Sequence, residues 1–160
     1  MASVKICGIS DADMVKVAAE AGADWAGFVL VPQSPRNVLG EGRNRFQRLV
    51  DLMSAATANG LQSVVLLSDP EPAILRGLDG AVMPDVFQLH GKETPDFVSN
   101  LRSSLPSSVE VWKAVGVSTR EDLEAAARYK AADRLLIDAR PPEGADRTGG
   151  HGEAFDWSIL

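Results

Sequence analysis

Short runs of apolar, β-branched residues alternate along the chain with longer segments in which apolar residues recur at helical spacing. This alternation is typical of strand–helix units that feed a parallel sheet. It predicts an α/β fold with six such units, each opened by a buried strand. The predicted strands are Val4–Cys7, Trp25–Leu30, Ser63–Leu67, Val86–Leu89, Val109–Val115 and Arg134–Asp138.

The segments between the predicted strands carry start and stop signals for helices. Ser10 or Asp11 can cap a first helix that ends at Gly22. Beyond the sixth strand, residues 139–155 are dense in Pro and Gly, and Asp156 can cap one more helix. Two further helices are predicted over residues 45–58 and, with interruptions at Pro72 and Gly77, over residues 70–78. Another begins at Thr94-Pro95 and ends at Pro106, and the next begins at a capping-box pattern, Ser118–Glu121, and continues to Tyr129.

Two parallel architectures are compatible with this order. An open, doubly wound sheet usually carries a Gly-rich phosphate fingerprint after its first strand, and Cys7-Gly8-Ile9-Ser10 lacks that pattern. An eight-unit barrel typically needs about 250 residues. The 160 residues therefore predict a single domain over 1–160, a TIM (β/α)8-type barrel with six of its eight units present and a C-terminally incomplete end.

Charge and composition narrow the possible partners. The net charge is −6 and the basic residues are scattered, which argues against nucleic acid. No apolar run approaches the roughly 20 residues that a membrane span needs, and the start of the chain lacks a secretory signal, so a cytoplasmic protein without a membrane partner is expected. The single cysteine, Cys7, cannot form an intramolecular disulfide.

Polar side chains at the carboxyl ends of the predicted strands are the candidates for chemistry, because barrel enzymes gather their catalytic groups there. Cys7 and Asp138 stand out as a potential thiolate base and a carboxylic acid, the pair that moving a proton across a substrate requires. The two histidines are too far apart to suggest a metal site. The candidates are Lys5, Cys7, Arg36, Asp69, Gln88, His90, Lys113 and Asp138.

Each candidate also has a purely structural interpretation. Cys7 can be a small buried hydrophobe, and Asp138 can cap its own loop. Arg36 can be a solvated loop charge, or it can bind a substrate carboxylate with both arms of its guanidinium. Among the remaining candidates, His90 can make a local loop hydrogen bond, Gln88 can be a satisfied core amide, and the strand residues Lys5 and Lys113 each require an ion-pair partner or a ligand.

Several motifs at the predicted strand ends together resemble the phosphoribosylanthranilate isomerases of tryptophan biosynthesis. The resemblance runs from end to end of the chain, and the motifs occur in the family's order. They are Lys5-Ile6-Cys7-Gly8-Ile9, Gly27-Phe28-Val29 with Ser34-Pro35-Arg36, Gln88-Leu89-His90-Gly91, Leu136-Ile137-Asp138-Ala139, Gly149-Gly150-His151-Gly152 and Phe155-Asp156-Trp157.

The resemblance implies an Amadori rearrangement of N-(5′-phosphoribosyl)anthranilate that needs no cofactor and no metal. It makes Asp138 the general acid and Cys7 the general base. Arg36 grips the anthranilate carboxylate, and substrate-binding roles follow for Lys5, Gln88 and His90. The implied partner is a small phosphosugar, and the protein is expected to be a monomer or a homodimer.

Two features depart from the family's pattern. His151 stands where the family usually has a small polar residue between glycines. The loops that hold the substrate phosphate in such barrels follow strands seven and eight, which this chain is predicted to lack. A non-catalytic partial barrel that pairs through its open edges, or another sugar-phosphate barrel enzyme, therefore remains as an alternative.

Overall fold

A computed structural model describes residues 2–81 and 83–139 of the chain. Six strands form one sheet in the order β1-β2-β3-β4-β5-β6, and every neighbouring pair is parallel. The strands are β1 (Lys5–Cys7), β2 (Trp25–Val29), β3 (Gln62–Leu67), β4 (Val86–Leu89), β5 (Glu110–Val117) and β6 (Arg134–Ala139). The helices are α1 (Ala12–Glu20), the 3-10 turn η1 (Gly42–Asn44), α2 (Gln47–Ala58), α3 (Pro72–Ala81), α4 (Pro95–Ser104) and α5 (Arg120–Ala126).

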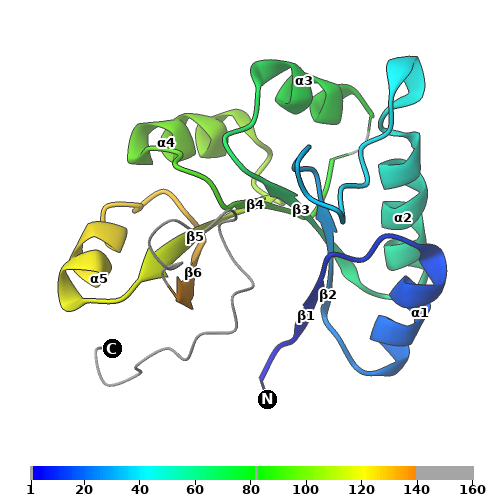
Figure 1. Ribbon diagram of the computed structural model, residues 1–160, viewed down its shortest axis with the longest axis horizontal. Helices are drawn as coiled ribbons and strands as arrows, with labels where there is room; N and C mark the ends of the chain where they lie inside the picture. The colour runs from blue at the N-terminus through cyan, green and yellow to red at the C-terminus, as the bar shows by residue number, and fades with distance from the viewer. Residues whose placement is uncertain (1, 82, 140–160) are drawn as a thin grey trace.

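The sheet curls so that its helices lie around the convex side (Figure 1). β1 and β6 are the outermost strands. The predicted α/β fold, with six parallel strand–helix units arranged as part of a barrel, is thereby confirmed. The other predicted features beyond β6, including the Gly149–Gly152 motif and the helix cap at Asp156, lie outside the described residues.

Several local predictions differ from the structure. The helix α5 ends at Ala126, three residues before its predicted end at Tyr129. The helix α3 continues through Gly77 to Ala81, because a side chain there would lie 2.3 Å from the Phe46 ring and glycine lets the helix pack against that ring. The strand β5 extends to Val117, two residues beyond its predicted end. The capping box of α5 is formed by Thr119 and Asp122, one residue later than predicted, because the chain is still leaving β5 at the expected start.

The two faces of the sheet bury different cores. On the convex side, apolar residues of the strands pack against the helices in one large cluster. On the concave side, a smaller cluster consists of strand residues alone, Trp25, Val64, Val86 and Trp112. The two indole rings, from β2 and β5, meet edge to face with centroids 5.3 Å apart, and the Arg134 guanidinium of β6 lies over both rings.

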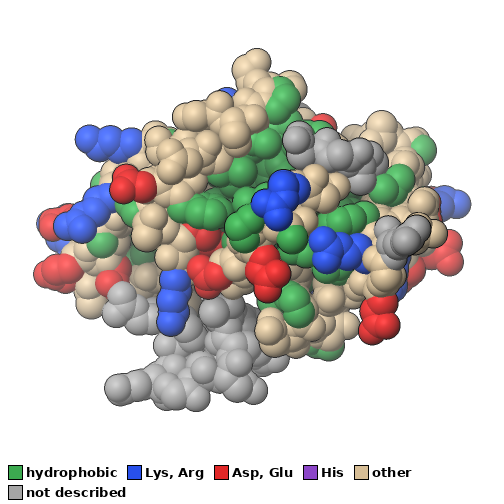
Figure 2. Space-filling view, turned by 90° about the horizontal axis from the view of Figure 1, so that it is seen from above, with side chains coloured by type: hydrophobic (Ala, Val, Ile, Leu, Met, Phe, Trp, Pro, Cys, Tyr) green, Lys and Arg blue, Asp and Glu red, His purple; other side chains and the backbone are tan. Residues whose placement is uncertain are grey.

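The surface of the described part is mixed in charge. On the face in Figure 2, Lys and Arg side chains are interspersed with Asp and Glu side chains around exposed apolar ones. Over residues 2–81 and 83–139, no helix combines the length and the apolar character that crossing a membrane requires.

Candidate active site at the carboxyl ends of the strands

The alternation of side chains along parallel strands brings most of the predicted site residues to one face. Lys5 and Cys7 share a face of β1, and their register partners on β2 are Trp25 and Gly27. Trp25 belongs to the concave cluster, so Cys7 also faces the concave side. Asp138 lies near the end of β6, where it pairs in register with Gly116 of β5. The predicted base and acid therefore come from the two outermost strands of a sheet that curls toward its concave side.

Cys7 is exposed, so the interpretation of this residue as a small buried hydrophobe is wrong for the described structure. Its neighbour on β2 is Gly27, where an added Cβ would lie 3.2 Å from the Cys7 Sγ and 3.1 Å from its Cα. The strand β2 thus leaves room beside the thiol because it carries no side chain at that position. The thiolate is the form that acts as a base, and a free, accessible cysteine can supply it.

Arg36 is brought to the end of β1 by the long loop after β2. The loop is anchored where Asn37 bridges to Val29, and the Arg36 amide donates to the Ser34 Oγ at 3.2 Å. The side chain lies against Gly8, where an added Cβ would be 2.6 Å from the Arg36 Cδ. Gly8 also has a φ of +84°, a conformation that glycine adopts without strain. The guanidinium is therefore held one residue beyond Cys7, and the side chain remains exposed.

Lys5 and Gln88 meet although they come from β1 and β4. The Lys5 Nζ donates a hydrogen bond to the Gln88 Oε1. Gln88 is buried, with 2% of its surface exposed, whereas Lys5 is half-buried. The interpretation of Gln88 as a satisfied core amide is correct as far as its oxygen is concerned, and the same contact gives Lys5 the polar partner that a strand lysine needs.

His90 and Asp138 approach each other across the sheet. The His90 Nε2 lies 3.5 Å from the Asp138 Oδ2, and the two side chains are 23% and 43% exposed. Burial is the main reason that the pKa of His90 lies below its ordinary value. The Lys113 and Lys5 charges lower the pKa further, while Asp138 and Glu93 act in the opposite direction. A mostly neutral imidazole therefore faces the predicted acid near neutral pH.

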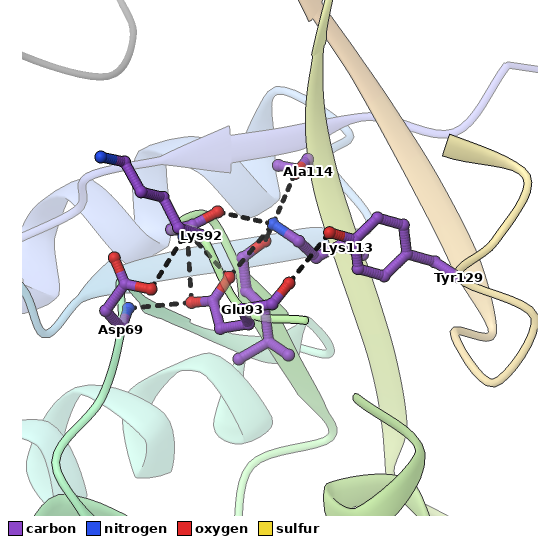
Figure 3. Close-up of polar contacts among 8 residues, drawn as sticks. Asp69, Lys92, Glu93, Lys113, Ala114 and Tyr129 are labelled. Carbon is purple, nitrogen blue, oxygen red and sulfur yellow. Dashed lines mark hydrogen bonds and ion pairs between the residues drawn. The ribbon is translucent and has the colours of Figure 1, made fainter. Parts of the chain in front are cut away.

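Lys113 lies on the convex face of β5 and has a partner that the pattern of strand residues does not predict. Its Nζ is 3.1 Å from the Glu93 Oε2, and the two side chains are only 2% and 1% exposed. Figure 3 shows this ion pair at the centre of a set of hydrogen bonds that includes Asp69 and Tyr129. The expectation that a strand lysine needs an ion-pair partner or a ligand is confirmed for Lys113. A Glu two residues after His90-Gly91 was the available signal for the partner.

Not every feature of the molecule contributes to the concave site. A cleft of about 340 Å³ lies between α5 and the start of α4, and Tyr129 and Pro95 help to line it. The cleft shares Lys113 with the buried ion pair rather than Cys7 or Asp138 with the candidate site. In the described ranges, no group of three or more His, Cys, Asp or Glu side chains is arranged to hold a metal ion. His151 lies outside these ranges.

Comparisons with known proteins agree in sequence and in fold. A family model described as N-(5′-phosphoribosyl)anthranilate (PRA) isomerase matches residues 4–160. An N-(5′-phosphoribosyl)anthranilate isomerase of Hyphomonas neptunium is 43% identical over 160 residues, which are 100% of this chain and 70% of that protein. The chain is thus shorter than this relative.

Solved structures extend the agreement to the fold. The phosphoribosyl anthranilate isomerase of Thermotoga maritima has a TM-score of 0.80 and 30% identity, over 99% of this chain and 70% of its own. A second such isomerase, solved in complex with reduced 1-(o-carboxyphenylamino)-1-deoxyribulose 5-phosphate, has a TM-score of 0.72 and 29% identity, over 87% of this chain and 66% of its own. With its curled sheet of six parallel units and its match over residues 4–160, the chain belongs to the N-(5′-phosphoribosyl)anthranilate isomerase family.

Proposed function

We propose that this chain carries the acid–base chemistry that converts N-(5′-phosphoribosyl)anthranilate into 1-(2-carboxyphenylamino)-1-deoxyribulose 5-phosphate, a step of tryptophan biosynthesis. Family membership supports the reaction, and one observation supports the roles of the residues. Cys7, Arg36, His90 and Asp138 come from four separate segments, yet all lie at the carboxyl ends of the strands. This end of a parallel barrel is where catalytic groups gather.

The proposed reaction needs one acid and one base. Asp138 donates a proton to the ribose ring oxygen, so the ring opens and a Schiff base forms between C1′ and the anthranilate nitrogen. The thiolate of Cys7 then removes the proton from C2′, and the electron pair moves toward the nitrogen to give an enolamine. Tautomerisation of the enolamine yields the 2-ketone. Carbon C1′ is reduced and C2′ is oxidised within one molecule, so the electrons balance without an external redox partner.

The remaining candidates bind and orient the substrate in this proposal. Arg36 binds the anthranilate carboxylate, for which a guanidinium beside the base is suited because it can donate two parallel hydrogen bonds. Lys5 and Gln88 line the floor of the concave face, where their mutual hydrogen bond fixes the orientation of both. His90 lies 3.5 Å from Asp138, and the Lys5 charge helps to lower the pKa of its imidazole. A phosphosugar ligand agrees with the bound molecule in one structural relative.

Turnover can be followed through the fluorescence of phosphoribosylanthranilate over time. Cys7→Ser and Asp138→Asn are each expected to lower kcat by about 10²–10⁴-fold, the range of a single acid–base group. Arg36→Met is expected mainly to raise KM, because it removes a binding contact. Asp13→Asn, which neutralises an exposed carboxylate on α1, serves as the control and leaves both constants unchanged. Unaltered turnover in the Cys7→Ser/Asp138→Asn double variant contradicts the assignment.

The assembly of the protein is a separate part of the proposal. We expect a monomer or a homodimer, and size-exclusion chromatography distinguishes the two against the chain mass of 17.0 kDa. A dimer that disappears when β1 is altered supports pairing through the outermost strands. A monomer at all concentrations contradicts pairing through the outermost strands.

A further inference from the structure

The buried ion pair of Lys113 and Glu93 has no part in the chemistry proposed above. Its two side chains are almost fully removed from solvent. Taking two charges out of water carries a large desolvation cost, which is offset only when further hydrogen bonds satisfy both groups. The partners of this pair therefore indicate what it does.

The ammonium of Lys113 binds the backbone on both sides of His90. Its Nζ donates to the carbonyl of Gly91 at 2.9 Å and, more weakly, to that of Leu89 at 3.4 Å. A third hydrogen bond, to the carbonyl of Ala114 at 2.8 Å, holds the ammonium to its own strand. The residue that faces Asp138 is thus flanked by two carbonyls that share one cation.

The carboxylate of Glu93 binds the same stretch from the other side. It accepts hydrogen bonds from the Gly91 amide at 3.0 and 3.2 Å and from the Asp69 amide at 2.9 Å. The Asp69 carboxylate in turn accepts from the Lys92 amide at 2.8 Å. The loops after β3 and β4 are therefore joined through two acidic side chains, Glu93 and Asp69 (Figure 3).

Tyr129, just after α5, closes the network. Its hydroxyl donates to the Glu93 carbonyl at 2.9 Å, and the Lys113 Nζ lies 5.6 Å from the centre of its ring. Burial, and then the Glu93 charge, raise the pKa of Tyr129. The hydroxyl accordingly stays protonated and able to donate.

We propose that Lys113 and Glu93 are positioning residues for the active site, which fix His90 against Asp138 by holding the backbone of residues 89–91. That His90 and Asp138 form part of an active site rests on the proposed function. That the pair holds the backbone beside His90 rests on the hydrogen bonds alone. The pair lies on the convex side of β5 and is joined to the concave site through the backbone at the end of β4. Its two charges also act on the pKa of His90. Its loss displaces His90 without removing any group that touches the substrate.

The test is the NMR titration of His90 in the full chain. The chain contains only two histidines, so a His151→Gln background leaves one imidazole signal. In this background, the double variant Lys113→Met/Glu93→Gln replaces the pair with uncharged side chains of similar size. The pKa of His90 is expected to rise, because the Lys113 effect that is lost exceeds the opposing Glu93 effect. The groups that remain near the imidazole are Asp138 and Lys5.

Lys113→Arg separates position from charge. The guanidinium keeps the positive charge, but its planar fork cannot direct three hydrogen bonds from one nitrogen. We expect a folded protein in which the His90 signal and its titration are displaced, and in which kcat falls by about 10²-fold while KM changes less. Lys92→Met is the matched control, since it removes an exposed lysine beside Glu93. It is expected to leave the titration unchanged.

The proposal is overturned if folded Lys113→Arg titrates as the unaltered chain does, even when the double variant shifts, because the double variant also removes two charges that act on His90. It is equally overturned if Lys92→Met displaces the His90 titration as far as Lys113→Arg. Neither result affects the proposed function, which the Cys7→Ser and Asp138→Asn variants test separately. Conversely, a chain without turnover still reports through NMR whether the pair positions His90.

Discussion

Beside the carboxyl end of β4, where Lys113 of β5 meets Glu93, the charged side chains are buried and multiply hydrogen-bonded. The polar side chains at the ends of β1 and β6 are instead exposed or half-exposed. Lys113 and Glu93 are almost fully buried. Cys7 is exposed, and the Asp138 side chain is 43% exposed. The middle of the sheet therefore supplies rigidity, and the outermost strands supply the groups proposed to react. This difference predicts that substitutions at the buried pair lower stability, whereas substitutions at the outermost strands lower activity with little loss of stability.

The largest expected effect on stability is at the buried pair. Lys113→Met leaves the Glu93 carboxylate buried without its cation, and we expect the free energy of unfolding to fall by about 3–5 kcal/mol. Urea denaturation followed by circular dichroism measures the change. Lys16→Met is the control, because Lys16 pairs with Glu20 at 3.8 Å with both side chains 67% exposed. That variant is expected to change stability by less than about 1 kcal/mol. Equal effects in the two variants contradict the comparison.

A smaller loss is expected from a methyl group added within the network. In Gly91→Ala the new Cβ meets the backbone amide of Asp69 at 2.6 Å, so the two loops must move apart. Overpacking of this kind costs about 1–3 kcal/mol. Gly40→Ala is the control, since its Cβ meets nothing closer than 3.4 Å. Thermal unfolding compares the stability of the two variants. A Gly91→Ala protein as stable as Gly40→Ala shows that the loops after β3 and β4 are not tightly joined.

The pH dependence of stability is expected to show a modest contribution from His90. Burial lowers the pKa of His90 in the folded protein, so the unfolded chain binds the proton more readily. Stability is therefore lost as the pH falls through the ordinary value of 6.5 toward the folded pKa, and it is unaffected by His90 above that window. Urea denaturation of the unaltered chain and of His90→Gln at several pH values tests this. A His90→Gln protein with the same loss of stability below pH 6.5 contradicts the assignment.

The smallest effect on stability is expected at the outermost strands. Cys7→Ser and Asp138→Asn replace exposed or half-exposed groups with others of nearly the same size, so each changes the free energy of unfolding by about 0.5 kcal/mol or less. The same denaturation experiment measures this change. A loss as large as that of Lys113→Met shows instead that the edges are structural.

Most strand ends were predictable from sequence because the apolar run stops at a polar or glycine residue, whereas β5 continues through Gly116 to Val117. This placed Cys7, Gln88, His90 and Asp138 at the ends of parallel strands, whose carboxyl ends meet at one edge of the sheet. Their functional roles stay predictions. The alternation of apolar and polar residues cannot predict the partner of each side chain, because the partner depends on how strongly the sheet curls.

The missing partners came from outside the strands. Glu93 reaches Lys113 across 20 positions of sequence, and Tyr129 joins the pair from a segment beyond α5. The interruption expected at Gly77 was wrong for a related reason. Propensity disfavours glycine within a helix, but the Phe46 ring occupies the space of its absent side chain, so packing decides the helix. Local patterns thus gave the elements, and contacts between elements determined the details.

The contact between Trp25 and Trp112 has a practical use in spectroscopy. The two indoles belong to strands β2 and β5 and touch at 5.3 Å only because the sheet between them is bent. We expect rings this close to couple their electronic transitions, so their contribution to the circular dichroism should change when the curvature of the sheet changes. A polypeptide or ligand that changes the curvature of the concave side is therefore expected to change this signal, so the two tryptophans serve as an intrinsic spectroscopic probe.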